Sequence, residues 1–196
     1  MGKGKLTKNM IIEKAAELFN CLGFAGVSLS DLMKATGLKK GGIYNHFKNK
    51  EEIRVRAFEH MIRNVQVEVL EAIQSKTTAK GQLYGIVAFF RNSALNPVIK
   101  GGCPLLNAMV DADNADPGFQ RSVNKVVDGL IRDISRIIRT GIENGEFRST
   151  VDPLKTSVVI LSTIEGGVAI SRNYTQDQHM NIVIDHLLEY IDTIAA

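Results

Sequence analysis

The chain has 196 residues, 44% of them hydrophobic and 6% aromatic, and a formal net charge of +3. A chain of this length and apolar content can bury the core of one compact unit or of two modest ones. Its most apolar window, residues 158–170, is short and is interrupted by polar side chains. We therefore expect no membrane span, and because the N-terminus lacks an apolar signal region we expect a cytoplasmic protein.

Helical periodicity extends over most of the sequence, and strand-like alternation is rare. Pro117 follows Asp116 and Pro153 follows Asp152, so each proline stands where the first residue of a helix follows its N-cap. We predict an all-α fold of about nine helices. They comprise a helix over 7–21, two short helices within 28–47, a long helix over 49–74, and further helices at about 79–94, 103–113, 117–143, 153–172 and 176–195.

Positive charge is concentrated in the N-terminal part of the chain. Residues 1–60 hold 11 Lys and Arg against 6 Asp and Glu, a net of +5, whereas residues 61–196 have a net charge of −2. A basic end suits phosphate binding, although a solvated charged surface would have the same composition. The motif in this part of the chain has to decide between the two.

Residues 27–50 have the features of a helix-turn-helix. Ser28 and Asp31 have the spacing of a capping box, which predicts a helix start, and Gly37 supplies the positive φ of a tight turn. A second short helix would then place Ile43 and Phe47 on its inner side. Two such short helices need neighbouring helices to hold them, because they are too short to be stable alone.

The run from Gly37 to Glu52 reads Gly-Leu-Lys-Lys-Gly-Gly-Ile-Tyr-Asn-His-Phe-Lys-Asn-Lys-Glu-Glu and follows the pairs Gly23-Phe24 and Val27-Ser28. It resembles the N-terminal signature of the TetR family of bacterial transcriptional regulators. The resemblance implies a helix-turn-helix DNA-binding domain over residues 1–48 and a helical ligand-binding and dimerisation domain over residues 49–196. The sequence departs from the family at Lys39, where Ser is frequent, and at Gly42, where a small side chain is common.

The recognition helix would lie in the major groove of operator DNA, and a dimer would place two such helices on two half-sites. Lys40 and Lys50 are the expected phosphate contacts at its two ends, and Asn45 is the best candidate for reading a base. For His46 a structural role is favoured over a phosphate contact. The full set of expected DNA-contacting residues is Thr7, Ser28, Lys39, Lys40, Gly42, Tyr44, Asn45, His46 and Lys50.

The last two expected helices are apolar on more than one face, so they need partners on two sides. In the family such helices form a four-helix bundle with their symmetry mates, which implies a homodimer. The alternative is that they are core helices of a monomer.

The family resemblance also implies a small-molecule effector, and the apolar composition of the expected pocket suggests a hydrophobic or aromatic compound. Its candidate lining residues are Phe89, Phe90, Leu106, Met109, Val110, Leu161, Ile164, Glu165 and Val168. Glu165 stands in the most apolar window, where a carboxylate needs a partner: Arg91, Arg172 or a ligand group. Gly166-Gly167 within a helix requires a compensating close approach, at a dimer contact or beside a ligand.

Two other classes of function compete with that of a ligand-responsive repressor. An enzyme could use His179, His186 and Asp185 with Cys103 as nucleophile, but no catalytic or metal-binding motif is present, so we expect neither catalysis nor a cofactor or metal. A DNA-binding dimer without an inducer fits the sequence as well. Cys103 stands near an expected helix start, where a thiol is either redox-active or, as we favour, inert.

Overall fold

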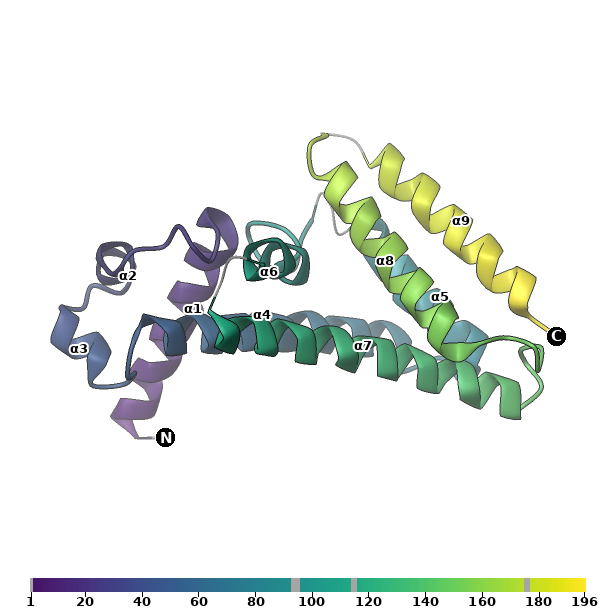
Figure 1. Cartoon of the computed structure of the whole chain (residues 1–196), viewed down its shortest axis with the longest axis horizontal. Coiled ribbons are helices and arrows are strands. Elements are labelled where there is room, and N and C mark those ends of the chain that lie inside the picture. The colour runs from purple at the N-terminus through teal and green to yellow at the C-terminus, as the bar shows by residue number, and fades with distance from the viewer. Residues whose placement is uncertain (1, 93–95, 114–115, 175–176) are drawn as a thin grey trace. The chain divides into compact units, whose positions relative to one another are not determined.

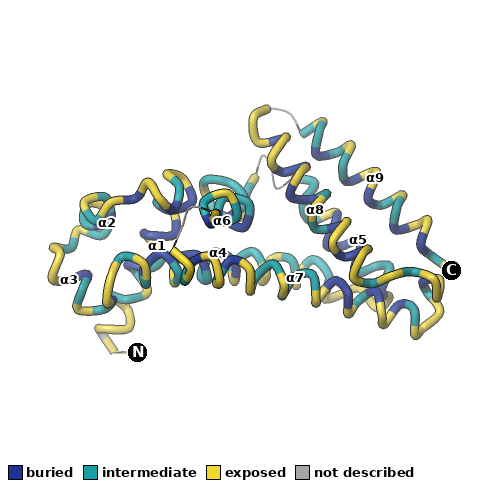
Figure 2. The backbone as a smooth tube through the Cα atoms, in the orientation of Figure 1, coloured by how far each residue is buried: buried dark blue, intermediate teal, exposed yellow. Residues whose placement is uncertain are grey.

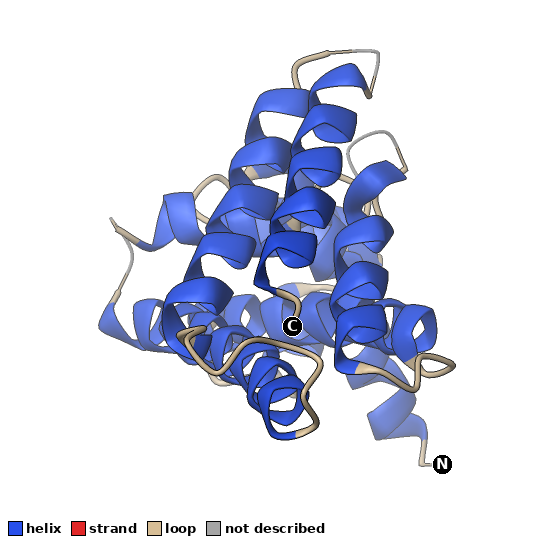
Figure 3. Ribbon diagram, turned by 90° about the vertical axis from the view of Figure 1, so that its right-hand side faces the viewer, coloured by secondary structure: helices blue, strands red, loops and turns tan. Residues whose placement is uncertain are grey.

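The computed structural model describes residues 2–92, 96–113, 116–174 and 177–196, and helices make up most of this part of the chain (Figures 1 and 3). Over these residues the protein has nine α-helices, one short 3-10 helix and no β-strand, which confirms the all-α prediction. The α-helices are α1 (Lys3–Leu22), α2 (Leu29–Thr36), α3 (Lys40–Tyr44), α4 (Lys50–Ile73), α5 (Ala79–Phe89), α6 (Pro104–Ala112), α7 (Pro117–Glu143), α8 (Pro153–Ser171) and α9 (Gln178–Ile194).

Three boundaries differ from the sequence prediction. Helix α1 begins at Lys3 and not at Thr7, and α3 ends at Tyr44, so Phe47 lies beyond it. The helix expected over 79–94 is α5 followed by a 3-10 turn at Phe90–Asn92, and its last two residues lie outside the described part of the chain. The N-caps Asp116 and Asp152 are confirmed, since each accepts hydrogen bonds from the first turn of its helix.

The chain forms two compact units, each of which is discontinuous in sequence. The first unit comprises Met1–Val65 and Val98–Val123, and the second comprises Gln66–Pro97 and Asn124–Ala196. The first unit thus contains the expected DNA-binding segment 1–48 together with the start of α4, all of α6 and the start of α7. The boundary after residue 48, between a DNA-binding domain and a ligand-binding and dimerisation domain, stays a prediction.

Four phenylalanine rings form the core of the first unit. Phe24, in the loop between α1 and α2, lies 4.9 Å from the ring of Phe119, 5.6 Å from that of Phe19 and 6.0 Å from that of Phe58, measured between centroids. All four side chains are fully buried. Figure 2 shows, on the backbone, that α1 and α4 both contain buried positions. On α1 the core is completed by Ile11, whereas the neighbouring Ile12 is half-buried. Aromatic contact area therefore holds α1, α4 and α7 around one loop residue.

In the second unit α8 packs against α9, and α5 packs against α9. A Cβ atom on Gly167 would lie 2.9 Å from Val183 Cγ1 and 3.0 Å from Met180 Sδ, so the absence of a side chain allows α8 and α9 to approach closely. Gly166, by contrast, is exposed and has open space where its Cβ would be. The expected compensation for the two glycines is thus found at Gly167, inside the protomer.

Among the described helices, α8 is long enough and apolar enough to cross a membrane, judged by length and composition alone. This helix packs on α9, and 44% of its apolar stretch is buried inside the protein.

Candidate nucleic-acid interface

A capping box fixes the start of α2. The Ser28 backbone N–H donates to Asp31 Oδ2 at 2.9 Å, and the Asp31 N–H donates to Ser28 Oγ at 3.2 Å. Ser28 Oγ also donates to Asp31 Oδ2 at 2.6 Å, and these hydrogen bonds lower the pKa of the Asp31 carboxyl. The predicted capping box is confirmed, and it leaves Ser28 exposed at the N-terminus of a helix.

The turn between α2 and α3 depends on Gly37, whose φ of 69° and ψ of 10° are left-handed. Its N–H donates to the Met33 carbonyl at 3.0 Å and ends α2, as the sequence predicted. Thr36 Oγ1 adds a bond to the Leu32 carbonyl at 2.7 Å and accepts from the Leu38 N–H at 3.3 Å. The connection is therefore fixed by hydrogen bonds from both sides of the glycine.

Helix α3 has five residues and is held on its inner side by Ile43, which is fully buried. Phe47, which follows the helix, is 3% exposed and seals the same core. Lys39, Lys40 and Asn45 are exposed. Since Lys39 is the N-cap and Asn45 the C-cap, two of these polar side chains stand at the ends of the helix. The outer side of α3 thus combines positive charge with a carboxamide, the groups that bind phosphates and base edges.

Gly42 and Tyr44 are half-buried on α3. A Cβ atom on Gly42 would lie 3.5 Å from Leu38 Cβ, an ordinary contact, so the fold does not require glycine there. The Lys40 ammonium lies 6.0 Å from the centre of the Tyr44 ring. Packing within the protein therefore gives no reason for a glycine at this position. Close approach of the backbone to DNA would give one.

Three expected DNA-contacting residues have surroundings that the sequence did not predict. Lys50 Nζ donates to the Val27 carbonyl at 2.9 Å, so its ammonium ties the start of α4 to the loop before α2. Thr7 is inside α1, and the argument that placed it at a helix N-terminus was wrong. His46 is half-buried, with Cε1 3.9 Å from the position of a Cβ on Gly4, at the start of α1.

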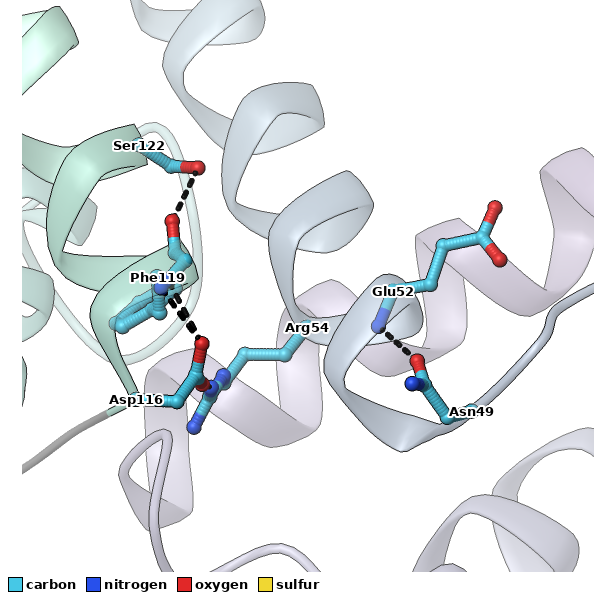
Figure 4. Close-up of polar contacts among 7 residues, drawn as sticks. Asn49, Glu52, Arg54, Asp116, Phe119 and Ser122 are labelled. Carbon is cyan, nitrogen blue, oxygen red and sulfur yellow. Dashed lines mark hydrogen bonds and ion pairs between the residues drawn. The ribbon is translucent and has the colours of Figure 1, made fainter.

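Asn49 caps the start of α4 (Figure 4). Asn49 Oδ1 accepts from the Glu52 N–H at 2.8 Å, while the Glu52 carboxylate accepts from the Lys48 N–H at 2.8 Å and not from Asn49 as a capping box would have it. Lys8 Nζ lies 3.8 Å from Glu52 and 4.9 Å from the centre of the Phe47 ring. Helix α1 is thereby joined to the segment that follows the recognition helix.

A buried arginine on α4 is the main residue that the sequence analysis missed. Arg54 forms an ion pair with Asp116 and lies 4.6 Å from the centre of the Phe119 ring (Figure 4). Asp116 also accepts from the N–H groups of Gly118 and Phe119, so one carboxylate caps α7 and pairs with α4. Burial lowers the pKa of the Arg54 guanidinium, although arginine keeps its charge in proteins.

Three side chains join the end of α1 and the following loop to the segment around α6. The Phe24 N–H donates to Asp111 Oδ2 at 2.6 Å. Asn20 Nδ2 donates to the carbonyls of Gly102 and Lys100 at 2.9 and 3.0 Å, and Asn107 Nδ2 donates to Asn20 Oδ1 at 2.9 Å. Helix α6 is thus bonded to the same unit as the helix-turn-helix.

The expected effector-lining residues are divided between the two units. Leu106 and Met109 are half-buried and Val110 is 69% exposed, all three on α6 in the first unit. In the second unit Ile164, Glu165 and Val168 are buried on α8, and Leu161 is half-buried. Phe89 and Phe90 form an edge-to-face pair with centroids 5.0 Å apart. The role of all these expected lining residues in binding an effector stays a prediction.

Two of the residues considered for catalysis, Asp185 and His179, contact other side chains in the second unit. Arg91 donates to Asp185 Oδ1 at 2.7 Å and to Asn181 Oδ1 at 3.2 Å, across to α9. The His179 ring lies 4.2 Å from that of Tyr174. Among the residues that the structure describes, no three His, Cys, Asp or Glu side chains are placed to hold a metal ion. Cys21 is exposed and Cys103 half-buried, and neither forms a disulfide.

Known proteins agree with this arrangement. Residues 11–57 match the family model of bacterial regulatory proteins of the tetR family, and residues 79–187 match that of the tetracyclin repressor-like C-terminal domain. A TetR transcriptional regulator from Chloroflexus aurantiacus is 33% identical, with a TM-score of 0.94, and the match covers 100% of this chain and 98% of that one. The chain belongs to the TetR family and is a transcriptional regulator with an N-terminal helix-turn-helix DNA-binding domain.

Two more distant relatives bear on function. The fatty acid metabolism regulator protein of Bacillus subtilis is 26% identical over 165 residues, which are 83% of this chain and 82% of that protein. The regulator CifR, in a cysteine mutant complexed with 26 bp double-strand operator DNA, is 16% identical with a TM-score of 0.79, over 92% of this chain and 94% of that one. At this identity the second likeness concerns the fold.

Proposed function

We propose that this TetR-family regulator is a cytoplasmic repressor that binds a palindromic operator as a homodimer and is released by a small hydrophobic or aromatic effector. The observation that carries the proposal is the short helix α3, which is anchored by Ile43 and carries Lys39, Lys40 and Asn45 exposed at and beside its ends. A recognition helix anchored on one side and polar on the other can enter the major groove.

The proposed DNA contacts divide into positioning and reading. Lys39, Lys40 and the exposed N-terminus of α2 at Ser28 would bind phosphates, and Tyr44 and Asn45 would face base edges. Gly42 would let the backbone approach the groove. His46, Thr7 and Lys50 would be supporting contacts, since an ammonium has three donors and Val27 takes one of those of Lys50.

The proposed dimer contact lies on α8 and α9. Large apolar side chains are exposed along α8 and α9 and in the turn between them: Leu154, Val158, Val159, Ile170, Tyr174 and Ile182. A two-fold contact between the same surfaces of two copies would cover them and would match the symmetry of a palindromic operator. The proposal therefore joins oligomeric state to DNA recognition.

The effector is proposed to be apolar because the candidate lining residues are apolar apart from Glu165. The printed name of one relative, fatty acid metabolism regulator protein, is compatible with such a compound. Fatty acyl compounds and small aromatic compounds are accordingly the first two chemical classes to screen.

Operator selection tests the proposal. The purified protein is incubated with a random duplex library, bound fragments are sequenced, and the selected site is titrated again with each compound class present. We expect an enriched palindrome whose affinity falls at least about fivefold with one class, the lower end of ordinary allosteric coupling. Failure to enrich any site would contradict DNA reading. A palindrome that no compound weakens would favour the alternative, a DNA-binding dimer without an inducer.

The dimer contact is tested separately by Ile170→Lys, with Ser149→Lys as the matched control in an exposed turn. A lysine within this apolar contact should weaken dimerisation by about 30-fold or more, the effect of a loss of about 2 kcal/mol. Sedimentation equilibrium gives the dimer dissociation constant. Equal constants for the two variants would place the dimer contact elsewhere.

A further inference from the structure

Two side chains of the second unit bury a polar atom that has no hydrogen-bond partner. The atoms are the hydroxyl oxygen of Ser171, the last residue of α8, and Nδ1 of His179, in the first turn of α9. Among the described residues the only other such side-chain atom is Nε of Arg54, in the first unit. A buried polar group without a partner costs free energy, so its presence calls for an explanation.

Ser171 belongs to the buried face of α8. It is fully buried and stands seven residues after Ile164 and three after Val168, which are buried on the same face of the helix. Ile164 and Val168 are two of the residues expected to line the effector site. The Ser171 hydroxyl therefore adds a polar group, about one helical turn further on, to an apolar part of that expected lining.

His179 lies at the same end of the second unit, where α8 meets α9 (Figure 1). The Tyr174 N–H donates to the Ser171 carbonyl at 3.0 Å, and the Tyr174 ring lies 4.2 Å from the His179 ring. Met180, next to His179, is fully buried, and its Sδ lies 3.0 Å from the position of a Cβ on Gly167, one turn before Ser171. The packing of α8 on α9 thus places both unpartnered atoms in one region of the unit.

A neutral oxygen atom of a ligand would suit both groups. A serine hydroxyl can donate and accept, and a ring nitrogen of a neutral histidine does one or the other. A ligand hydroxyl can pair with both in either case, and a ligand carbonyl can accept from both when Nδ1 carries the proton. A carboxylate would lose its hydration without gaining a cation, because Arg91, which contacts α9, is already paired with Asp185.

We propose that Ser171 and His179 bind the polar end of the effector, and that the effector is an apolar compound with one neutral oxygen function, a hydroxyl or a carbonyl. Its apolar part would contact Ile164 and Val168. The proposal rests on the proposed function, since it names the chemical class of the effector. Two polar groups in an apolar site orient a ligand, and they reject an analogue without the oxygen atom because they would then stay unpaired.

Stability in the absence of any ligand is the first test. Ser171→Ala removes a buried hydroxyl that has no partner, so it should raise the melting temperature at fixed protein concentration by about 2 °C. Ser157→Ala is the matched control on α8 and should lower it, because the fully buried Ser157 hydroxyl is bonded to Ser135 Oγ and to the Leu154 carbonyl, each at 2.8 Å. Equal losses in the two variants would overturn the proposal, since Ser171 would then have a structural bond.

Binding of two matched series of compounds to the full-length protein is the second test. One series is benzyl alcohol, acetophenone, toluene and benzoate, and the other is hexanol, hexanone, hexane and hexanoate. In at least one series, isothermal titration should show the alcohol or the ketone binding about tenfold or more tighter than the hydrocarbon and the carboxylate.

Substitutions then locate this preference. Ser171→Ala should reduce it about threefold or more and leave the affinity for the hydrocarbon unchanged, because only the hydrogen bond is lost. His179→Phe should act in the same way, since it keeps an aromatic ring beside Tyr174 but removes Nδ1. Ser162→Ala on α8 and His186→Phe on α9 are the controls, because both residues are exposed, and they should keep the preference of the wild type.

The outcomes separate this proposal from the proposed function. If no compound of either series binds the wild type, the assigned chemical class is wrong. If the hydrocarbon or the carboxylate binds as tightly as the alcohol and the ketone, or if neither substitution changes the preference, the polar site is wrong even where a compound releases the operator. If the preference is found but no bound compound weakens operator binding, the site stands and the proposed release by an effector fails.

Discussion

The two units differ in how completely they bury their apolar side chains. In the first unit four buried phenylalanines surround one another, and the large exposed apolar residues are Leu6, Leu22, Val98 and Val110. In the second unit the core of α8 and α9 is mainly aliphatic, and α8 alone exposes Leu154, Val158, Val159 and Ile170. The first unit thus buries most of its large apolar side chains within one chain and exposes charged side chains. The second unit exposes an apolar surface that suits contact with a second protein copy.

The two units also use glycine and capping differently. The first unit fixes its recognition segment by a capping box at Ser28 and a left-handed glycine at Gly37. The second unit uses Gly167 to bring two long helices together. In the first unit, local hydrogen bonds fix the ends of α2 beside the candidate recognition helix. In the second unit, the missing side chain of Gly167 allows α8 and α9 to pack closely.

The strongest expected contrast is between a core ring and an exposed residue of the first unit. Phe24→Ala should lower the free energy of unfolding by about 3–5 kcal/mol, because it removes a fully buried ring and leaves a cavity among three others. Urea unfolding followed by circular dichroism measures this. The control is Leu22→Ala, in which a 56% exposed side chain is shortened and a change of about 0.5 kcal/mol or less is expected. Similar losses for the two would contradict the central role given to Phe24.

The sequence predicted local features, such as caps and turns, better than it predicted the contacts of the core. The capping box at Ser28, the turn at Gly37 and the N-caps Asp116 and Asp152 were predicted because each depends on residues within a few positions. The start of α1 was missed because its N-cap, Gly2, has no side chain to signal it. That error carried over to Thr7.

The contacts that hold the candidate site together could not be predicted. Arg54 looked like any surface arginine of an amphipathic helix, and its partner Asp116 is 62 residues away. The bond from Phe24 to Asp111 involves a backbone N–H, which has no sequence signature. The motif predicts the candidate recognition residues, but the contacts around them join segments that are far apart in the sequence.

In the first unit, reading and positioning can be separated by two substitutions on or beside α3. Asn45→Ala should reduce discrimination at one base pair by about 1–3 kcal/mol while changing binding to random DNA little. Lys40→Ala should weaken binding to all sequences and reduce the magnitude of the salt slope by about 0.9, the contribution of one phosphate contact. Titrations of selected and random duplexes at several salt concentrations measure both. Equal losses on both duplexes for Asn45→Ala would remove its reading role.

In the second unit, adjacent glycines provide a matched pair. Gly167→Ala should destabilise the protein by about 1–3 kcal/mol, because the new methyl group would overlap Val183 and Met180. Gly166→Ala meets open space and should stabilise α8 by up to about 1 kcal/mol through helix propensity. Thermal unfolding at a fixed protein concentration compares them. A destabilising Gly166→Ala that also weakens dimerisation would show that the second copy comes close to this face of α8.

The smallest effect, at Ser28, depends on pH. Ser28→Ala should cost about 1 kcal/mol at neutral pH, the usual value of a lost N-cap. Hydrogen bonds from Ser28 lower the pKa of Asp31 in the folded protein below its ordinary 3.8, so their contribution is complete above that value and is lost as the pH falls through the lowered pKa. The cost of Ser28→Ala should therefore be constant from pH 7 to about 5 and shrink below about 4. Urea titrations of both proteins across this range measure it, and a cost that stays constant into acid would mean that the Ser28 hydroxyl acts through the Asp31 N–H and not through its carboxylate.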